Sequence, residues 1–124
     1  MSAGEPEVAV PAGQRDRLEQ ALFALAAARA TASYVDLARQ LAVAPPHHLR
    51  KLIVTLEQLA TEHHEAGLPI YSALCVSRVR EGLPAPGFFA HLSRIGAYDG
   101  SEDGESARAW HAAELERIFR APPR

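Results

Sequence analysis

Two consecutive prolines, Pro45 and Pro46, divide the chain and precede a segment in which apolar residues recur at helical spacing. Proline ends the helix before it and suits the first turn of the next one, where its missing N–H has no intrahelical use. The apolar stripe that follows comprises Leu49, Leu52, Ile53, Leu56, Leu59 and Ala60. Gly67 then supplies the left-handed residue at which helices stop. The sequence therefore predicts a long amphipathic helix from the prolines to Ala66.

Two further helices are predicted before the prolines. Residues 15–30 carry a leucine stripe with helical spacing, which indicates an amphipathic helix. Ser33 stands three residues before Asp36, so that its oxygen can accept a backbone N–H at a helix start while the acid favours the positive end of the dipole. The next helix is therefore expected at residues 34–41. Residues 1–13 mix Gly, Pro and Glu without periodicity, which predicts a flexible N-terminal arm.

The chain changes character after Gly67. Residues 70–79 form a run of apolar, aromatic and β-branched residues bounded by turn formers, which predicts a strand. A loop rich in Gly and Pro follows, and then a short helix at residues 88–95. Residues 99–104 have the composition of an acidic linker, and the strong helix formers of residues 105–124 predict a C-terminal helix.

This order of elements is that of a winged helix-turn-helix domain, in which the second helix lies across the third and a strand or wing follows. A chain of 124 residues has material for one such core. The expected fold is therefore mainly α, a winged helix-turn-helix over residues 14–98 with a short strand or wing and an additional C-terminal helix.

Composition narrows the class of protein. The formal charge is -2, which excludes a strongly cationic, histone-like protein, so any contact with nucleic acid must come from a local basic patch. One cysteine excludes an internal disulfide and favours a reducing, cytoplasmic location. No apolar run approaches the length of a membrane span, so we expect no membrane partner.

The densest group of basic side chains lies at the start of the helix after the prolines. Its members are His47, His48, Arg50 and Lys51. Such side chains reach phosphates or base edges, and the arginine fork matches the guanine edge. Arg78 and Arg80 occupy the region where a wing would contact the DNA backbone. The pattern predicts a small nucleic-acid-binding protein that binds duplex DNA, of the kind that acts as a transcription regulator.

A Ser-Tyr-Val-Asp-Leu-Ala segment at residues 33–38 is followed by Arg-Lys-Leu-Ile at residues 50–53 and by a Gly-Pro-rich turn. This order, over residues 33–89, resembles the C-terminal domain of the O6-alkylguanine DNA alkyltransferases and of their non-enzymatic alkyltransferase-like relatives. The resemblance implies a winged helix in which Tyr34 lies near a DNA phosphate and Arg50 probes the base stack.

The sequence departs from that family at its reactive site. The family carries a Pro-Cys-His-Arg motif, in which a histidine relay activates the thiol, because only the thiolate is an effective nucleophile. Cys75 is followed by Val76 and Ser77 and has no histidine near it in the sequence. A thiol in an apolar strand has a raised pKa and is inert. We therefore expect Cys75 to be a small buried side chain and the protein to have no enzymatic activity.

The histidines do not form a metal-binding pattern. The adjacent pairs at residues 47–48 and 63–64 diverge on a helix and lack the i, i+4 spacing that places two ligands on one face. No phosphate-binding glycine loop and no Gly-x-Ser-x-Gly motif is present. We therefore expect no metal and no cofactor.

Apolar residues in the C-terminal third allow two interpretations. Phe88 and Phe89 follow Pro86 and Gly87 directly, and each is either a core residue or an exposed contact beside the basic wing. The apolar anchors of the C-terminal helix, which are candidates for a homodimer interface, are Trp110, Ile118 and Phe119. Together with the acidic linker and the negative net charge, this helix also fits a second hypothesis, an adaptor or inhibitor that binds a protein.

Overall fold

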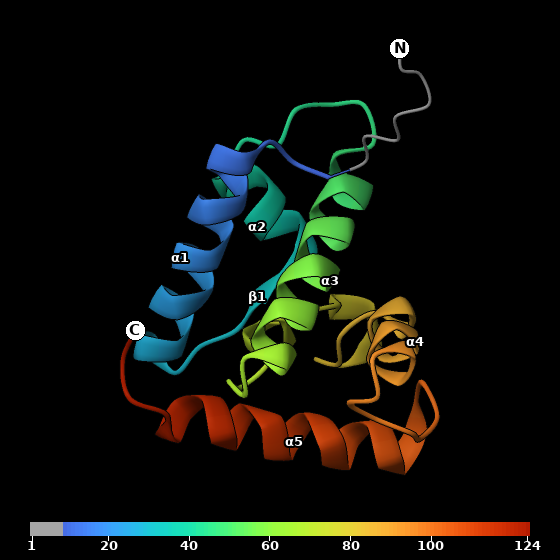
Figure 1. Cartoon of the computed structure of the whole chain (residues 1–124). Helices are drawn as coiled ribbons and strands as arrows, with labels where there is room; N and C mark the ends of the chain where they lie inside the picture. Colours follow the sequence, from blue (N-terminus) through green and yellow to red (C-terminus); the bar gives the residue numbers. More distant parts are fainter. Residues whose placement is uncertain (1–8) are drawn as a thin grey trace.

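The computed structural model describes residues 9–124 (Figure 1). The α-helices in this range are α1 (Ala12–Ala28), α2 (Tyr34–Gln40), α3 (His48–Glu65), α4 (Pro86–Arg94) and α5 (Gly104–Arg120). The short strands β1 (Ala32–Ser33) and β2 (Cys75–Val76) form a parallel pair. The predicted, mainly helical class is confirmed. Within residues 9–124 no helix is long and apolar enough to cross a membrane.

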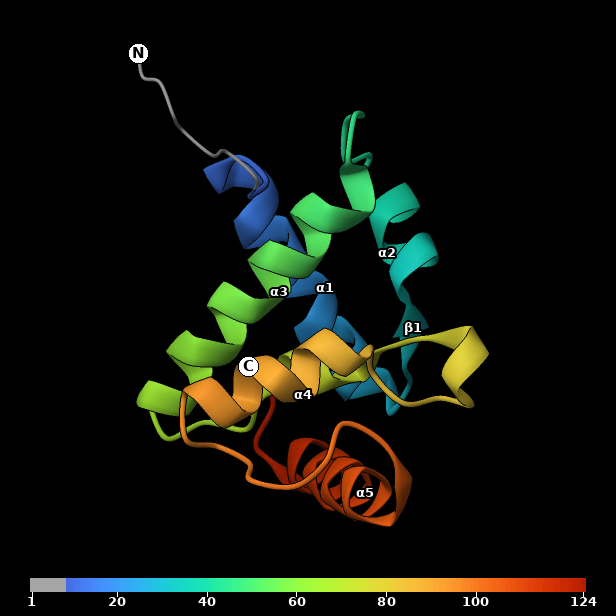
Figure 2. The same ribbon diagram turned by 90° about the vertical axis from the view of Figure 1, so that its right-hand side faces the viewer.

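α3 passes through the middle of the molecule, between α1 and α2 on one side and α4 on the other, and α5 runs across one end of this group (Figures 1 and 2). The side chains that α3 contributes to the core, each at most 3% exposed, are Leu52, Leu56, Leu59 and Ala60. They belong to the predicted apolar stripe. Leu49 and Ile53 of the same stripe are only partly buried, so the amino-terminal half of α3 keeps an apolar edge near the surface.

The amino-terminal boundary differs from the prediction. Residues 1–8 of the expected arm lie outside the described residues. Val10 is buried, and its N–H donates to the Thr55 hydroxyl at 3.1 Å. α1 begins at Ala12, directly after Pro11. The ordered chain therefore starts before residue 14, because Val10 finds an apolar site and a hydrogen-bond acceptor that no local pattern reveals.

The predicted strand at residues 70–79 is wrong in most of its length. Tyr71–Leu74 form a 3₁₀-helix, η1, only Cys75–Val76 are extended, and Arg78–Arg80 form a second 3₁₀-helix, η2. Every residue of η1 is buried, and the Ser72 hydroxyl donates to the Leu56 carbonyl at 2.7 Å. A short run that is buried on all sides has no period, so its sequence does not separate a strand from a buried turn.

The start of α2 follows the prediction. The Ser33 hydroxyl accepts the Asp36 N–H at 3.1 Å, which confirms the serine cap. α4 begins two residues earlier than predicted, because Pro86 is suited to a first helical turn. α5 ends at Arg120, shortly before two prolines that cannot continue a helix.

The acidic segment between α4 and α5 is exposed but has internal hydrogen bonds. The Tyr98 hydroxyl donates to the Ser101 carbonyl at 2.6 Å and lies 2.9 Å from the Ser106 hydroxyl. A tyrosine at the border of the segment thus ties it to the first turns of α5.

Candidate nucleic-acid interface

The amino end of α3 is cationic. His47 precedes the helix with a left-handed φ of 60°, and His48, Arg50 and Lys51 follow within its first residues. Among the described residues the first turn of α3 has no acid and no side-chain cap. Positive charge near a helix amino end is unfavourable, because it repels the positive end of the helix dipole. The first turns of α2 and α5 instead carry Asp36 and Glu105.

Three of these side chains face solvent. His47, His48 and Arg50 are exposed. Within residues 9–124 no carboxylate forms an ion pair with Arg50, whereas Arg39 and Arg78 both lie near Asp36. The uncapped N–H groups of the first turn and the free guanidinium together offer donors to an anion.

Lys51 has a structural role that the sequence did not reveal. It is partly buried, and its Nζ donates to the Ala44 carbonyl at 3.0 Å. Ala44 lies in the connection between α2 and α3, so Lys51 holds this connection against α3. The predicted direct contact of Lys51 with a phosphate would have to compete with this bond.

The two arginines of the predicted wing also have partners. The Arg78 guanidinium lies 2.6 Å from an Asp36 carboxylate oxygen, with 69% of the side chain exposed. Arg80 donates to the Pro84 carbonyl at 2.9 Å and to the Glu102 carbonyl at 2.5 Å. Arg80 therefore ties the turn at residues 77–85 to the segment before α5, while Arg78 remains accessible at the surface.

Tyr34, which the resemblance assigns to a phosphate, is used inside the fold. Its hydroxyl accepts the Ala85 N–H at 2.9 Å. Burial raises the pKa of this hydroxyl well above its ordinary value, and the proximity of Cys75 adds to the shift. Tyr34 therefore joins the start of α2 to the residue that precedes α4.

A shallow apolar groove separates the amino half of α3 from the 77–85 turn. Its volume is about 290 Å³, and it is lined by Ser33, Tyr34, Val35, Leu49, Ile53, Val76, Ser77, Arg78 and Val79. We call it the α3 groove. Sequence reasoning missed it, since it placed Val79 in a strand and gave Val35 no role. The one signal in the sequence was a valine set between two arginines in a segment that turn formers follow.

The aromatic pair after Pro86 belongs to the core. Phe88 and Phe89 are 4% and 0% exposed. They pack edge to face on each other, and both contact Trp110, with ring centroids 6.0 Å away in each case. The sequence allowed each phenylalanine to be either a core residue or an exposed contact, and in the structure both are core residues.

The apolar face of α5 also packs within the chain. Ile118 is 2% exposed, and Trp110 and Phe119 are partly buried against the same core. The Arg29 guanidinium lies over the Phe119 ring, 5.1 Å from its centroid. The side chains expected at a dimer interface are thus engaged by α1, α4 and η1 of their own chain.

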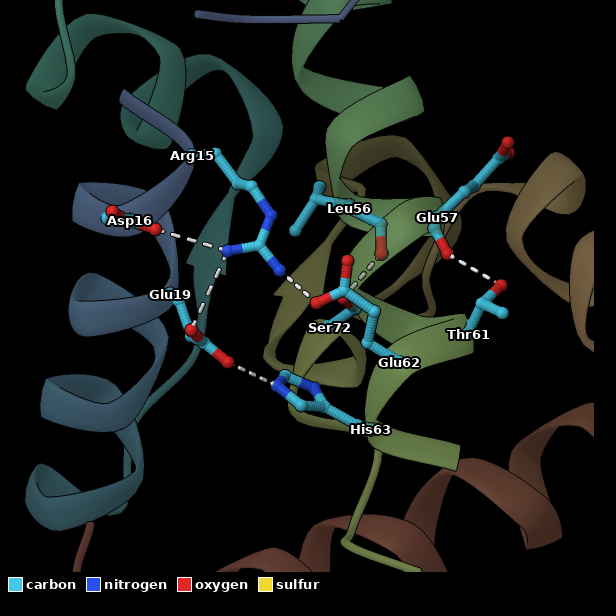
Figure 3. A network of polar contacts seen from close by, with 9 residues as sticks. All are labelled: Arg15, Asp16, Glu19, Leu56, Glu57, Thr61, Glu62, His63 and Ser72. Carbon is cyan, nitrogen blue, oxygen red and sulfur yellow. Dashed lines mark hydrogen bonds and ion pairs between the residues drawn. The ribbon is translucent and has the colours of Figure 1, made fainter. Parts of the chain in front are cut away.

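A polar network joins α1 to the carboxyl half of α3 (Figure 3). Arg15 pairs with Asp16 at 3.2 Å and with Glu62, and the buried His63 lies 2.7 Å from Glu19. Glu62 and His63 lie about three turns along α3 from Arg50. The network therefore holds α1 and α3 together and is separate from the basic amino end of α3.

Cys75 is buried as predicted. It is 0% exposed in β2, and burial raises the pKa of its thiol far above the ordinary value. In the described part of the chain no three His, Cys, Asp or Glu side chains gather in a way that would hold a metal.

Comparison of the chain with protein-family models, curated proteins and solved structures gives no match. The resemblance to the alkyltransferase domain therefore stays a prediction from residues 33–89.

Proposed function

We propose that this protein binds duplex DNA, without catalysis, through the amino end of α3. One observation carries the proposal: the first residues of α3 are cationic and exposed, with no acid among them, although this charge opposes the helix dipole. A local rule broken at a cost in stability is expected at a functional site. The basic side chains that we assign to DNA are Arg50, His47 and His48, with Arg78 in support.

The arrangement of the neighbouring elements favours a winged helix-turn-helix mode. α2 packs against α3, and the 77–85 turn stands out from the body beside β1, where a wing would lie (Figure 2). In this mode α3 enters the major groove by its amino end and the wing contacts the adjacent backbone. Because Lys51 and Arg80 are bound to carbonyls, we expect two to three neutralised phosphates and a log–log salt slope of about -2 to -3.

The second hypothesis, a protein-binding adaptor, has less support. It rested on the net charge, the acidic segment and the apolar face of α5. Ile118 is buried in the chain's own core, and Trp110 and Phe119 are partly buried against it, so the third argument no longer favours a separate partner.

The test compares Arg50→Ala with Arg120→Ala. Both side chains are exposed on helices, and both variants lose one positive charge, but Arg120 lies on α5 and pairs with Glu116. Anisotropy of a labelled random-sequence duplex is measured between about 50 and 200 mM salt. We expect Arg50→Ala to weaken binding about five- to tenfold and to reduce the salt slope by about 1.

Weaker binding by Arg50→Ala would not result from unfolding, because removing a cation from the amino end of a helix should not destabilise that helix. Arg120→Ala should bind like the unaltered chain. Binding that is absent, or equal losses in both variants, would reject the proposal, and a stoichiometric protein partner recovered in its place would favour the adaptor.

A further inference from the structure

Val79 is an apolar side chain that is almost fully exposed to solvent. Within residues 9–124 the exposed large apolar side chains are Val79 and Val35, with exposed fractions of 90% and 45%. Both line the α3 groove. Single exposed apolar residues are common, but two on one groove beside a cationic helix end form a patch that indicates a contact surface.

The turn that carries Val79 is braced at its base. The Ser77 N–H donates to the Leu83 carbonyl at 2.8 Å, and the Arg80 guanidinium donates to the carbonyls of Pro84 and Glu102. Ordering a loop on binding costs conformational entropy. A turn that is already held in shape loses little of it, so its tip is suited to insertion into a partner.

The charged side chain that lines the groove is a cation that pairs with an acid at the surface. Arg78 is the charged residue among those that line it, and its pairing with Asp36 is at the surface, where exchange for another anion is easy. Leu49, on the α3 wall, lies between His48 and Arg50 in the sequence. An apolar tip between cations matches a duplex, in which stacked bases lie between two lines of phosphates.

We propose that Val79 is a wedge that enters the minor groove, partly separates one base step and bends the duplex, while Arg78 exchanges Asp36 for a flanking phosphate. This inference rests on the proposed DNA binding at α3. Aliphatic side chains inserted at base steps kink DNA in minor-groove proteins, and the cost of unstacking is offset by the additional contact that the bend allows.

The test compares Val79→Ser with Val35→Ser, the same substitution on two walls of one groove. Donor and acceptor dyes at the two ends of a short duplex report the bend, and anisotropy reports the affinity. We expect Val79→Ser to lose the increase in energy transfer that the unaltered chain produces and to bind about five- to tenfold more weakly. Val35→Ser should keep the bend, because Val35 lies in α2 and not in the projecting turn, and should lose less affinity than Val79→Ser.

The outcomes separate the two proposals. If the unaltered chain binds no DNA, the proposed function fails and the wedge fails with it. If the unaltered chain binds and Val79→Ser binds and bends equally well, only the wedge is rejected. Equal losses in both variants would also reject it, because they would mean that the whole groove takes up a ligand. Thermal unfolding of both variants should match that of the unaltered chain, since neither side chain is buried.

Discussion

His111 is a buried histidine on the inner face of α5. Its Nε2–H donates to the Ala73 carbonyl at 2.9 Å. Burial lowers the pKa of this imidazole, and the bond to Ala73 opposes the shift only in part. The folded state therefore favours the neutral form more than the unfolded chain does.

We predict that His111 makes folding less stable in acid. Because its folded pKa lies below the ordinary value of 6.5, the unfolded chain binds more protons as the pH falls through that value. The contribution to stability is complete above pH 6.5 and is lost as the pH falls through the folded pKa. Urea unfolding at neutral and at acid pH measures this loss. His111→Gln keeps a donor for Ala73 but does not titrate, so it should lose less stability in acid, and an equal loss in both proteins would contradict the prediction.

Single residues were predictable from sequence when the partner was local. The Ser33 cap follows from the position of Asp36 three residues later, and burial of Cys75 follows from its apolar neighbours. Arg80 could not be predicted in this way. The sequence gives the charge of Arg80 but not its partners, because the Glu102 carbonyl comes within reach of the guanidinium only in the folded chain, as does the Pro84 carbonyl.

At the scale of elements, helices with a clear stripe were predicted and the segment after α3 was not. α3 follows its apolar spacing and ends near Gly67, as expected. Residues 70–76 are buried without a period, and the β-branched and aromatic residues of the segment suit a strand, so the 3₁₀-helices η1 and η2 were mistaken for one strand. The same error hid the α3 groove, because a valine assigned to a buried strand is not expected to face solvent, whereas Val79 is 90% exposed.

We predict that Tyr34→Phe loosens the junction between the 77–85 turn and α4. The variant removes the acceptor of the Ala85 N–H, and loss of one such hydrogen bond costs about 1 kcal/mol of unfolding free energy. Amide exchange at Ala85 should become faster, while amides in α5 should keep their protection. If stability and exchange were unchanged and DNA binding alone fell, the phosphate role implied by the alkyltransferase resemblance would be favoured instead.

At the scale of the whole molecule, the packing of α5 decides whether the fold needs a second copy of the chain to cover its apolar face. The sequence showed an apolar helix face but not whether its partner is the same chain or another one, since both bury the same side chains. In the structure α5 packs against η1 and α1, and it runs past the end of α1 (Figure 1); its buried residues include Ala107, His111 and Ile118. The expected dimer interface is thus used within one chain.

We therefore predict that Ile118→Ala lowers stability and does not dissociate a dimer. Ile118 is 2% exposed, and truncating a buried isoleucine costs about 2–5 kcal/mol, a large part of the 5–15 kcal/mol that holds a typical domain together. Urea unfolding measures the loss, and Arg120→Ala, exposed on the same helix, should change stability by less than about 0.5 kcal/mol. The unfolding midpoint of the unaltered chain should be independent of protein concentration, because unfolding that is coupled to dissociation shifts with concentration by mass action. A midpoint that rises with concentration, together with a smaller particle in Ile118→Ala, would restore α5 as a dimer contact and would give the proposed DNA-binding surface two α3 ends in place of one.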